Sequence, residues 1–397
     1  MLAMCQRRSS MSSRGRSDRI AALDALRALA ILLVIVHHLR RLPGRPELFA
    51  WIGTRAFVGV DIFFVLSGWL IGGQLLRHRA RTGRLGLGRF YARRWLRTLP
   101  AYYAALAILV VDGHLRADDL RSMLVFAQNY LAPLRWVISW SLCIEEHFYL
   151  ALPPLLLALA WLWRRSHRLA LALIAGLLLL SLLLRALAFP EMHAGSYRAF
   201  VGGFYMPTHL RLDGLAIGVA TAALAHRGGA AWRWCTDHAD RLAAAGALLL
   251  VGSAWNPYLT GASAASKIRM EWFAAVPLFW LVSLAVALMI PACVTPTSWL
   301  ARRRWLGATL VAEHAYTLYL TNEWGRVWTR DHLGWVRARG FWAEASACVL
   351  VSVIAALALR HLAEKPGLRA RAWLLGRRSA APTSGRDVRP PAVPEAR

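Results

Sequence analysis

Long apolar runs separated by short clusters of basic residues dominate the pattern along this chain. A helix crosses the hydrocarbon core of a bilayer with about 20 mostly apolar residues, and the run from Trp272 to Ala301 contains no charged side chain. The pattern predicts an all-α, polytopic integral membrane protein with about ten transmembrane helices. We place these helices at residues 22–40, 56–76, 98–114, 140–163, 169–189, 208–225, 242–260, 271–293, 305–323 and 342–362.

The composition supports this class of protein. Hydrophobic residues make up 57% of the 397 residues and charged residues 17%, whereas soluble domains carry about 25% charged residues. A net charge of +27 would indicate a nucleic-acid partner in a soluble protein, but basic clusters between apolar runs are typical of cytoplasmic loops. The five cysteines lie far apart, without metal-ligand spacing. We therefore exclude a secreted disulfide scaffold, a disordered protein and a soluble enzyme, and expect neither nucleic acid nor metal.

The distribution of basic residues predicts the orientation of the chain. With the N-terminus inside, the cytoplasmic segments carry about twice as many Lys and Arg residues as the external segments. We therefore expect both termini in the cytoplasm. The predicted organisation is a basic segment at 1–19, a transmembrane domain at 20–365 and a charged, Pro-rich, disordered tail at 366–397.

The first apolar run carries Arg27 and His38, two side chains that are expensive at membrane depth. They are eleven residues apart, so a helix separates them by roughly 16 Å and places both on one face. The predicted orientation puts Arg27 toward the cytoplasm and His38 toward the outer side. The alternative is a structural pair of Arg27 with Asp24 and an interfacial histidine.

The second apolar run and the loop after it add two further candidates. Asp61 lies at a depth similar to that of His38, where a carboxylate would orient an imidazole and stabilise its charge as it accepts a proton; an interfacial helix cap is the alternative. Arg94 and Arg97 share a helical face on the cytoplasmic side. Two guanidiniums suit the phosphates of a nucleotide-like cofactor, although a topology signal with lipid phosphate contacts explains them equally well.

The fourth predicted helix begins with WSLCIEEHFYL, which places two adjacent glutamates at the expected outer boundary of the membrane. Glu145 and Tyr149 are four residues apart and share a face. Tyr149 by itself is typical of an aromatic anchor at the membrane surface. Such an anchor does not explain the glutamates, so we take Glu145 as a candidate functional residue.

Seven segments, in order, resemble the membrane-bound acyltransferase 3 family, which includes bacterial O-antigen, exopolysaccharide and macrolide O-acyltransferases. The resemblance covers about residues 20–370. The segments are the R-x10-H pattern of Arg27 and His38, GVDIFFVLSGWLI with Asp61, FYARRWLRTLPAYY with Arg94 and Arg97, WSLCIEEHFYL with Glu145 and Tyr149, RLDGLAIG from Arg211, AYTLYL from Ala315 and EKP from Glu364.

This resemblance implies transfer of an acyl group, usually acetyl from acetyl-CoA, from the cytoplasmic side to a hydroxyl group at the outer side. The acceptor would be a cell-envelope glycan or a lipid-linked sugar, the other partner would be membrane lipid, and the location would be the bacterial inner membrane. The implied roles are His38 as general base or transient acyl carrier, catalysis with Asp61 and Glu145, acyl-CoA binding by Arg27, Arg94 and Arg97, and substrate binding by Tyr149, Arg211 and Asn322.

The chain departs from the family pattern at three positions. Cys143 replaces the usual serine, His147 replaces glutamine, and Asn322 stands where members often have histidine. Many members carry a fused extracytoplasmic domain, and we expect this chain to recognise its acceptor through the membrane domain and loops alone. A transporter or flippase is the competing class, because intramembrane Arg, Asp and His also mark substrate pathways. It is disfavoured because the two halves show no repeat. A glycosyltransferase, a third class, would need an Asp-rich donor site on the cytoplasmic side, and the loop at 77–97 contains no acidic residue.

Overall fold

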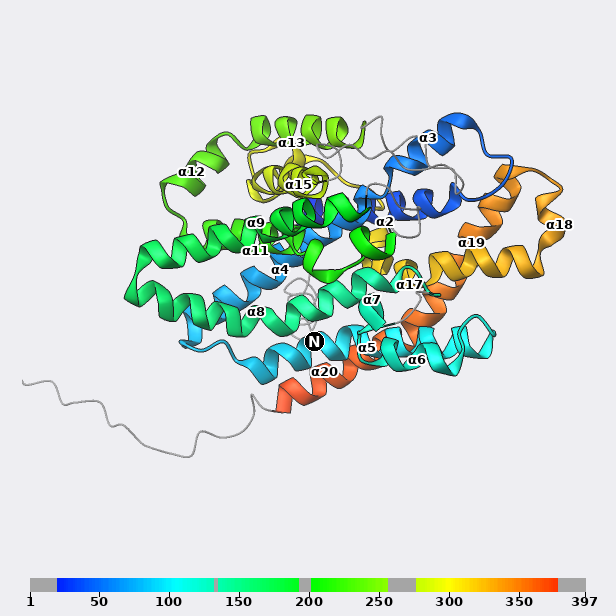
Figure 1. The fold of residues 1–397 in the computed structure, drawn as a ribbon, viewed down its shortest axis with the longest axis horizontal. Helices are drawn as coiled ribbons and strands as arrows, with labels where there is room; N and C mark the ends of the chain where they lie inside the picture. Colours follow the sequence, from blue (N-terminus) through cyan, green and yellow to red (C-terminus); the bar gives the residue numbers. More distant parts are fainter. Residues whose placement is uncertain (1–19, 132–134, 193–200, 256–275, 378–397) are drawn as a thin grey trace, which may run out of the picture.

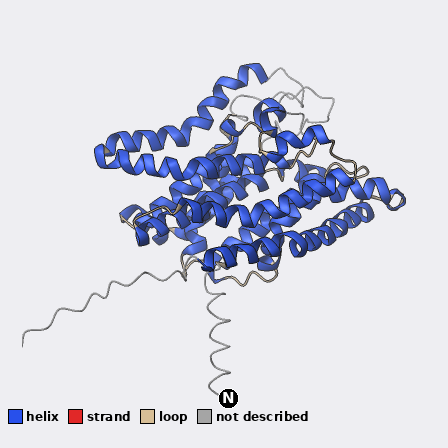
Figure 2. Cartoon of the chain, turned by 90° about the horizontal axis from the view of Figure 1, so that it is seen from below, coloured by secondary structure: helices blue, strands red, loops and turns tan. Residues whose placement is uncertain are grey.

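The computed structural model describes residues 20–131, 135–192, 201–255 and 276–377. Within these ranges the chain is helical and contains no strand (Figure 2). The long helices are α2 (Ala21–Leu39), α4 (Val58–Thr82), α5 (Leu87–Val111), α8 (Ser139–Arg165), α9 (His167–Met192), α11 (Asp213–Arg227), α13 (Ala239–Ala254), α15 (Leu278–Val294), α17 (Ala308–His332) and α19 (Phe341–Leu359). Shorter elements are α3 (Glu47–Arg55), α6 (Ala117–Leu124), α7 (Gln128–Leu131), η1 (Val201–Tyr205), η2 (Thr208–Leu210), α12 (Ala230–Asp237), α16 (Trp299–Arg302), α18 (Gly334–Arg337), η4 (Arg360–Glu364) and α20 (Lys365–Arg377).

Each predicted membrane run overlaps one of these long helices. The ends at 256–260 and 271–275 lie outside the described residues. Among the described residues, five helical segments are long and apolar enough to cross a bilayer, and α15 is a shorter apolar helix. The all-α, membrane-type architecture is therefore confirmed, while the count of ten spans and the cytoplasmic termini stay predictions. The five segments are Ala21–Leu39, Glu47–Thr82, Ser139–Arg165, His167–Phe189 and Phe341–Gly376.

Helices α5 and α17 extend furthest beyond the apolar runs that predicted them. Helix α5 begins at Leu87 rather than at 98, and α17 continues to His332 rather than ending at 323. Arginine propagates a helix nearly as well as leucine does. The hydrophobic pattern therefore marks only the apolar part of such a helix and misses the basic turns at its end.

The chain also stays folded beyond the expected start of the tail at 366. Helix α20 continues through Arg377 and packs against α5. Gly367 permits this contact, because a Cβ atom there would meet the backbone carbonyl of Leu96 and the ring of Pro100. The predicted boundary is therefore too early; the residues after Arg377 lie outside the described ones.

The helices run broadly alongside one another, with α13 and α15 at one edge and α5 and α20 at the opposite edge (Figure 1). Helices α4 and α11 cross without intervening side chains, since a Cβ atom on Gly68 would strike the carbonyl of Leu215 and one on Gly218 would strike that of Val65. Small residues permit this close approach in membrane helices. Helix α2 packs against both α4 and α17, which places its polar side chains in the interior.

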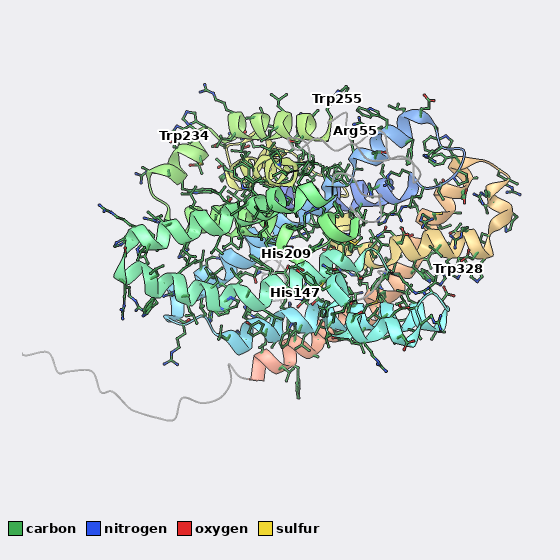
Figure 3. The ribbon with its side chains drawn as sticks, in the orientation of Figure 1. Arg55, His147, His209, Trp234, Trp255 and Trp328 are labelled. Carbon is green, nitrogen blue, oxygen red and sulfur yellow. The ribbon has the colours of Figure 1, made fainter. Side chains whose placement is uncertain are left out.

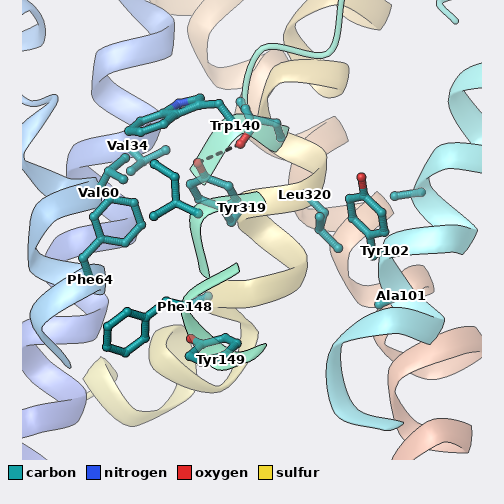
Figure 4. Packing of buried hydrophobic residues seen from close by; sticks show 14 of the residues in the cluster. Val34, Val60, Phe64, Ala101, Tyr102, Trp140, Phe148, Tyr149, Tyr319 and Leu320 are labelled. Carbon is teal, nitrogen blue, oxygen red and sulfur yellow. Dashed lines mark hydrogen bonds between the residues drawn. The ribbon is translucent and has the colours of Figure 1, made fainter. Parts of the chain in front are cut away.

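Aromatic side chains fill the core between α4, α8 and α17 (Figure 4). Phe64 meets Trp140 edge to face, with ring centroids 6.0 Å apart. The hydroxyl of Tyr319 donates to the carbonyl of Ile138 at 3.0 Å, so this buried polar atom is satisfied. The core therefore fixes α17 against the start of α8, and it sets the position of the polar side chains described next.

Candidate active site

His38 lies in the last turn of α2 and faces Asn322 of α17. The side-chain amide of Asn322 donates to the carbonyls of Leu318, at 3.1 Å, and Tyr319, at 2.6 Å. These bonds fix the amide nitrogen, so its Oδ1 is the atom that accepts a hydrogen bond from Nδ1 of His38. Nε2 of His38 is then unprotonated, and within the described ranges it has no hydrogen-bond partner. The residue is poised to accept a proton at Nε2.

A carboxylate that the sequence did not single out stands beside this imidazole. Oε2 of Glu323 is 3.6 Å from Nδ1 of His38. Its other oxygen forms ion pairs with Arg41, at 3.0 Å, and Arg326, at 2.7 Å. Two cations keep the carboxylate ionised and fixed, so it can stabilise positive charge on the imidazole. The only signal in the sequence was its place next to Asn322, at the end of the predicted run 305–323 that contains AYTLYL.

Asp61 does not contact His38, and that expectation is wrong. Its Oδ1 accepts a hydrogen bond from Arg211 at 2.7 Å, and both side chains are inaccessible to solvent. The Arg211 guanidinium also lies 3.6 Å from the ring centroid of Phe279. A carboxylate that is fully buried needs a cationic partner. Arg211, which lies between η2 and α11, supplies it. Arg211 is thus occupied by an internal ion pair.

A second cluster joins α5 to α8. Arg94 donates to Oε2 of Glu145 at 3.0 Å and to the hydroxyl of Tyr149 at 2.5 Å, and this hydroxyl donates to the same oxygen of Glu145 at 2.6 Å. Ser67 of α4 donates to the other carboxylate oxygen at 3.3 Å. The expectation that Glu145 and Arg94 lie on opposite sides of the membrane is therefore wrong. Tyr149 is buried, so the surface-anchor alternative is wrong as well.

A pocket opens beside this cluster, between α5, α8 and α17. Its lining includes Thr98, Tyr102, Glu145, Glu146 and Tyr316. Arg94 stands near two carboxyl groups, those of Glu145 and Glu146. Hydrogen bonds within the cluster join Arg94, Glu145 and Tyr149.

Arg27 and Arg97 differ from Arg94 in their surroundings. Arg27 forms the Asp24 ion pair that the sequence had left open, at 3.0 Å. Arg97 is exposed and forms no hydrogen bond or ion pair with any described residue. Of the two arginines expected to hold phosphates, only Arg97 is available, since Arg94 is bonded to Glu145.

The departures at Cys143 and His147 serve local packing. The Cys143 thiol is buried and donates to the carbonyl of Phe126 at 2.7 Å. His147 shares a hydrogen bond of 3.0 Å with the hydroxyl of Thr208. His147 and His209 lie near each other in the middle of the molecule (Figure 3), and Tyr130 stacks on both rings. These contacts tie α7 and α8 to η2. No group of three His, Cys, Asp or Glu side chains in the described part of the chain could hold a metal ion.

Comparison with known proteins identifies the family. The profile of the acyltransferase 3 family, described as an acyltransferase domain, matches residues 20–361. The peptidoglycan O-acetyltransferase OatA of Listeria monocytogenes is 34% identical over 41% of this chain and 28% of its own length. The putative peptidoglycan O-acetyltransferase YrhL of Bacillus subtilis is 34% identical over 51% of this chain and 33% of its own length.

A putative O-acetyltransferase of Staphylococcus aureus, SACOL0978, is 31% identical over 52% of this chain and 35% of its own length. The matched region thus spans about a third of these curated relatives. No solved structure matches the chain. The profile match covers most of the chain and includes every segment of the candidate site. The chain therefore belongs to the acyltransferase 3 family.

Proposed function

We propose that this protein moves an acetyl group from acetyl-CoA on the cytoplasmic side of the bacterial inner membrane to a hydroxyl group of a cell-envelope glycan on the outer side. The observation that carries the proposal is the geometry at His38. Asn322 accepts from Nδ1 and Glu323 lies beside it, which leaves Nε2 as the base. This arrangement is typical of a general base, and the chain that carries it belongs to an acyltransferase family.

Direct transfer needs one proton to move twice. Nε2 of His38 accepts the proton of the acceptor hydroxyl, whose oxygen attacks the carbonyl carbon of the thioester. The carbon–sulfur bond then breaks, and the sulfur leaves with the electron pair of that bond. The imidazolium returns its proton to the sulfur, giving coenzyme A and an acyl ester. Glu323 stabilises the imidazolium between these steps, at 3.6 Å from Nδ1.

The distance between Arg27 and His38 along α2 suits the extended shape of the acyl-CoA donor. Arg27 and His38 are separated by roughly 16 Å along one helix face, and Arg97 lies close enough to Arg27 for their charges to interact. Coenzyme A carries its phosphates at one end and its thioester at the end of a flexible arm. Phosphates near Arg97 therefore place the thioester toward His38.

The choice of acceptor follows from the relatives. Two of them are named as known or putative peptidoglycan O-acetyltransferases, so we take an envelope glycan as the acceptor class. A lipid-linked sugar is the alternative form of the same chemistry, since it presents sugar hydroxyls at the same membrane surface.

The test uses the purified protein in nanodiscs with radiolabelled acetyl-CoA and envelope glycan extract. His38→Ala should lower the transfer rate by about 100-fold or more, because the reaction loses its base. His37→Ala is the matched control, because the neighbouring ring is bound to the carbonyl of Gly53 at 2.9 Å through its own Nδ1. It should retain most of the activity.

Two results would contradict the proposal. One is full transfer by a correctly inserted His38→Ala protein, judged by its melting temperature. The other is coenzyme A release that does not depend on any added glycan or lipid-linked sugar and yields no ester. Label that stays on the wild-type protein would instead add a covalent acyl carrier to the route.

A further inference from the structure

Helix α20 lies beside α5 (Figure 1). The contact centres on Gly367, where a Cβ atom would meet the carbonyl of Leu96 and would lie 2.8 Å from the ring of Pro100. Arg371 follows Gly367 by four residues and therefore lies on the same face of α20. Its side chain consequently faces α5 one helical turn further on.

Arg371 and two arginines of α5 share an unusual lack of partners. Neither Arg371 nor Arg93 nor Arg97 forms a hydrogen bond or ion pair with any residue in the described ranges. The carboxylate that approaches Arg97 is Glu364, which precedes α20 and is buried, with one oxygen that has no hydrogen-bond partner. Arg27 lies nearby but is paired with Asp24. Positive charge therefore exceeds negative charge here.

The charges of this group are close enough to affect one another. Desolvation, followed by the charges of Arg94 and Arg27, lowers the pKa of Arg97 to about 10. Desolvation, followed by the charges of Arg89 and Arg371, also lowers the pKa of Arg93. Guanidiniums that repel one another in this way are stabilised by a bound anion, and their planar donors match the oxygens of phosphate.

We propose that Arg93, Arg97 and Arg371 form one phosphate-binding site, and that this site holds the phosphate groups of the acyl-CoA donor. The inference rests on the proposed function and adds α20 to the donor site. A lipid headgroup offers the same chemistry. The donor is favoured because Arg97 lies near Arg27, at the far end of the helix that carries His38. This position puts the phosphates and the reacting thioester at opposite ends of α2.

The test compares donors with and without phosphates, using the full chain in nanodiscs. Arg371→Ala should raise the KM for acetyl-CoA by about tenfold, the loss expected for one charge-assisted hydrogen bond. Its kcat should stay within about twofold, because the base is untouched. The KM for S-acetyl-pantetheine, which has no phosphate, should not change. Arg371→Lys should recover part of the loss.

Arg369 provides the matched control on the same helix. It precedes Arg371 by two residues, which places it about 160° away around α20, and it is exposed. Arg369→Ala removes the same charge from the chain and should leave both KM values unchanged. An equal rise in KM for Arg369→Ala and Arg371→Ala would overturn the inference in favour of a general surface charge.

Equilibrium dialysis with coenzyme A alone separates this inference from the proposed function. If the wild type binds coenzyme A and Arg371→Ala does not, the phosphate-binding site is supported. If no acetyl transfer accompanies this binding, the proposed function fails while the site stands. Equal binding by both proteins, or no binding by either, overturns the site. Nanodiscs with and without anionic lipid complete the test. If Arg371→Ala changes only the binding of anionic lipid, the site belongs to a lipid headgroup, and the inference is overturned.

Discussion

Replacement of Glu323 by glutamine removes one charge beside His38 while keeping nearly the same shape. The carboxylate oxygen lies 3.6 Å from Nδ1 of His38. Two unit charges at this distance attract by roughly 5 kcal/mol at an effective dielectric constant near 20 and by roughly 1 kcal/mol in water. Arg41 and Arg326 share the carboxylate and repel the imidazolium. We therefore take the lower part of this range, ~2 kcal/mol, which corresponds to about 30-fold in kcat.

The assay is steady-state acetyl transfer in nanodiscs. Glu323→Gln should lower kcat by this amount with little change in the KM for acetyl-CoA, since the imidazolium forms only during the reaction. Glu323→Asp retains the charge and should recover part of the rate. Glu313→Gln is the matched control on the same helix, where the partner is Arg360 at 3.3 Å and the carboxylate is 31% exposed.

A purely structural role for Glu323 predicts a different result. It would lower the melting temperature and the amount of active protein, without a selective effect on kcat. A Glu323→Gln protein with a kcat within about twofold of the wild-type value would refute the reasoning. Even the attraction between the two charges in water corresponds to a larger change in rate than that.

Two further predictions concern stability, measured as thermal unfolding in detergent. Gly218→Ala should destabilise the protein by ~1–3 kcal/mol, because the added methyl group meets the carbonyl of Val65. The control is Gly176→Ala, where the added methyl group has nothing within 4 Å; it should be neutral or slightly stabilising. Equal effects of the two substitutions would argue against a tight crossing of α4 and α11. Asp61→Asn should lower the stability by ~3–5 kcal/mol, because it leaves the buried Arg211 without its ionic partner. Asp24→Asn should lower the stability far less, because the Arg27 side chain that pairs with Asp24 is 24% exposed. Similar losses of stability in the two variants would show that burial of the pair is unimportant.

The sequence predicted the features that follow from local pattern. Apolar runs located the long helices, because a membrane helix must satisfy its backbone internally and present an apolar surface. The spacing of Arg27 and His38 placed them on one face of α2, since helical geometry alone determines this. The motif order identified the family, which the profile match confirms.

The partners of the polar side chains could not be predicted in this way. Asp61 and Arg211 are 150 residues apart, and His38 and Asn322 are 284 apart. A position along the membrane normal can be estimated from hydropathy, but the rotation of one helix toward another depends on packing at crossings such as Gly68. Asp61 was therefore assigned to the wrong neighbour.

The prediction of α20 failed for a related reason. The contact of this helix with α5 depends on the absence of a side chain at Gly367. A short basic segment before a Pro-rich tail reads as disordered when no partner surface is considered. Arg371 was therefore not recognised as a neighbour of Arg97.

Helix α2 sets the distance between the proposed base, His38, and the basic residues near its other end. Eleven residues of backbone, at roughly 1.5 Å each, fix how far the base stands from the basic end. One residue inserted between Arg27 and His38 would change this length only slightly, but it would turn the imidazole by about 100° away from Asn322. The apolar exposed positions Leu29 and Leu32 can therefore vary in identity, whereas the number of residues in this stretch cannot.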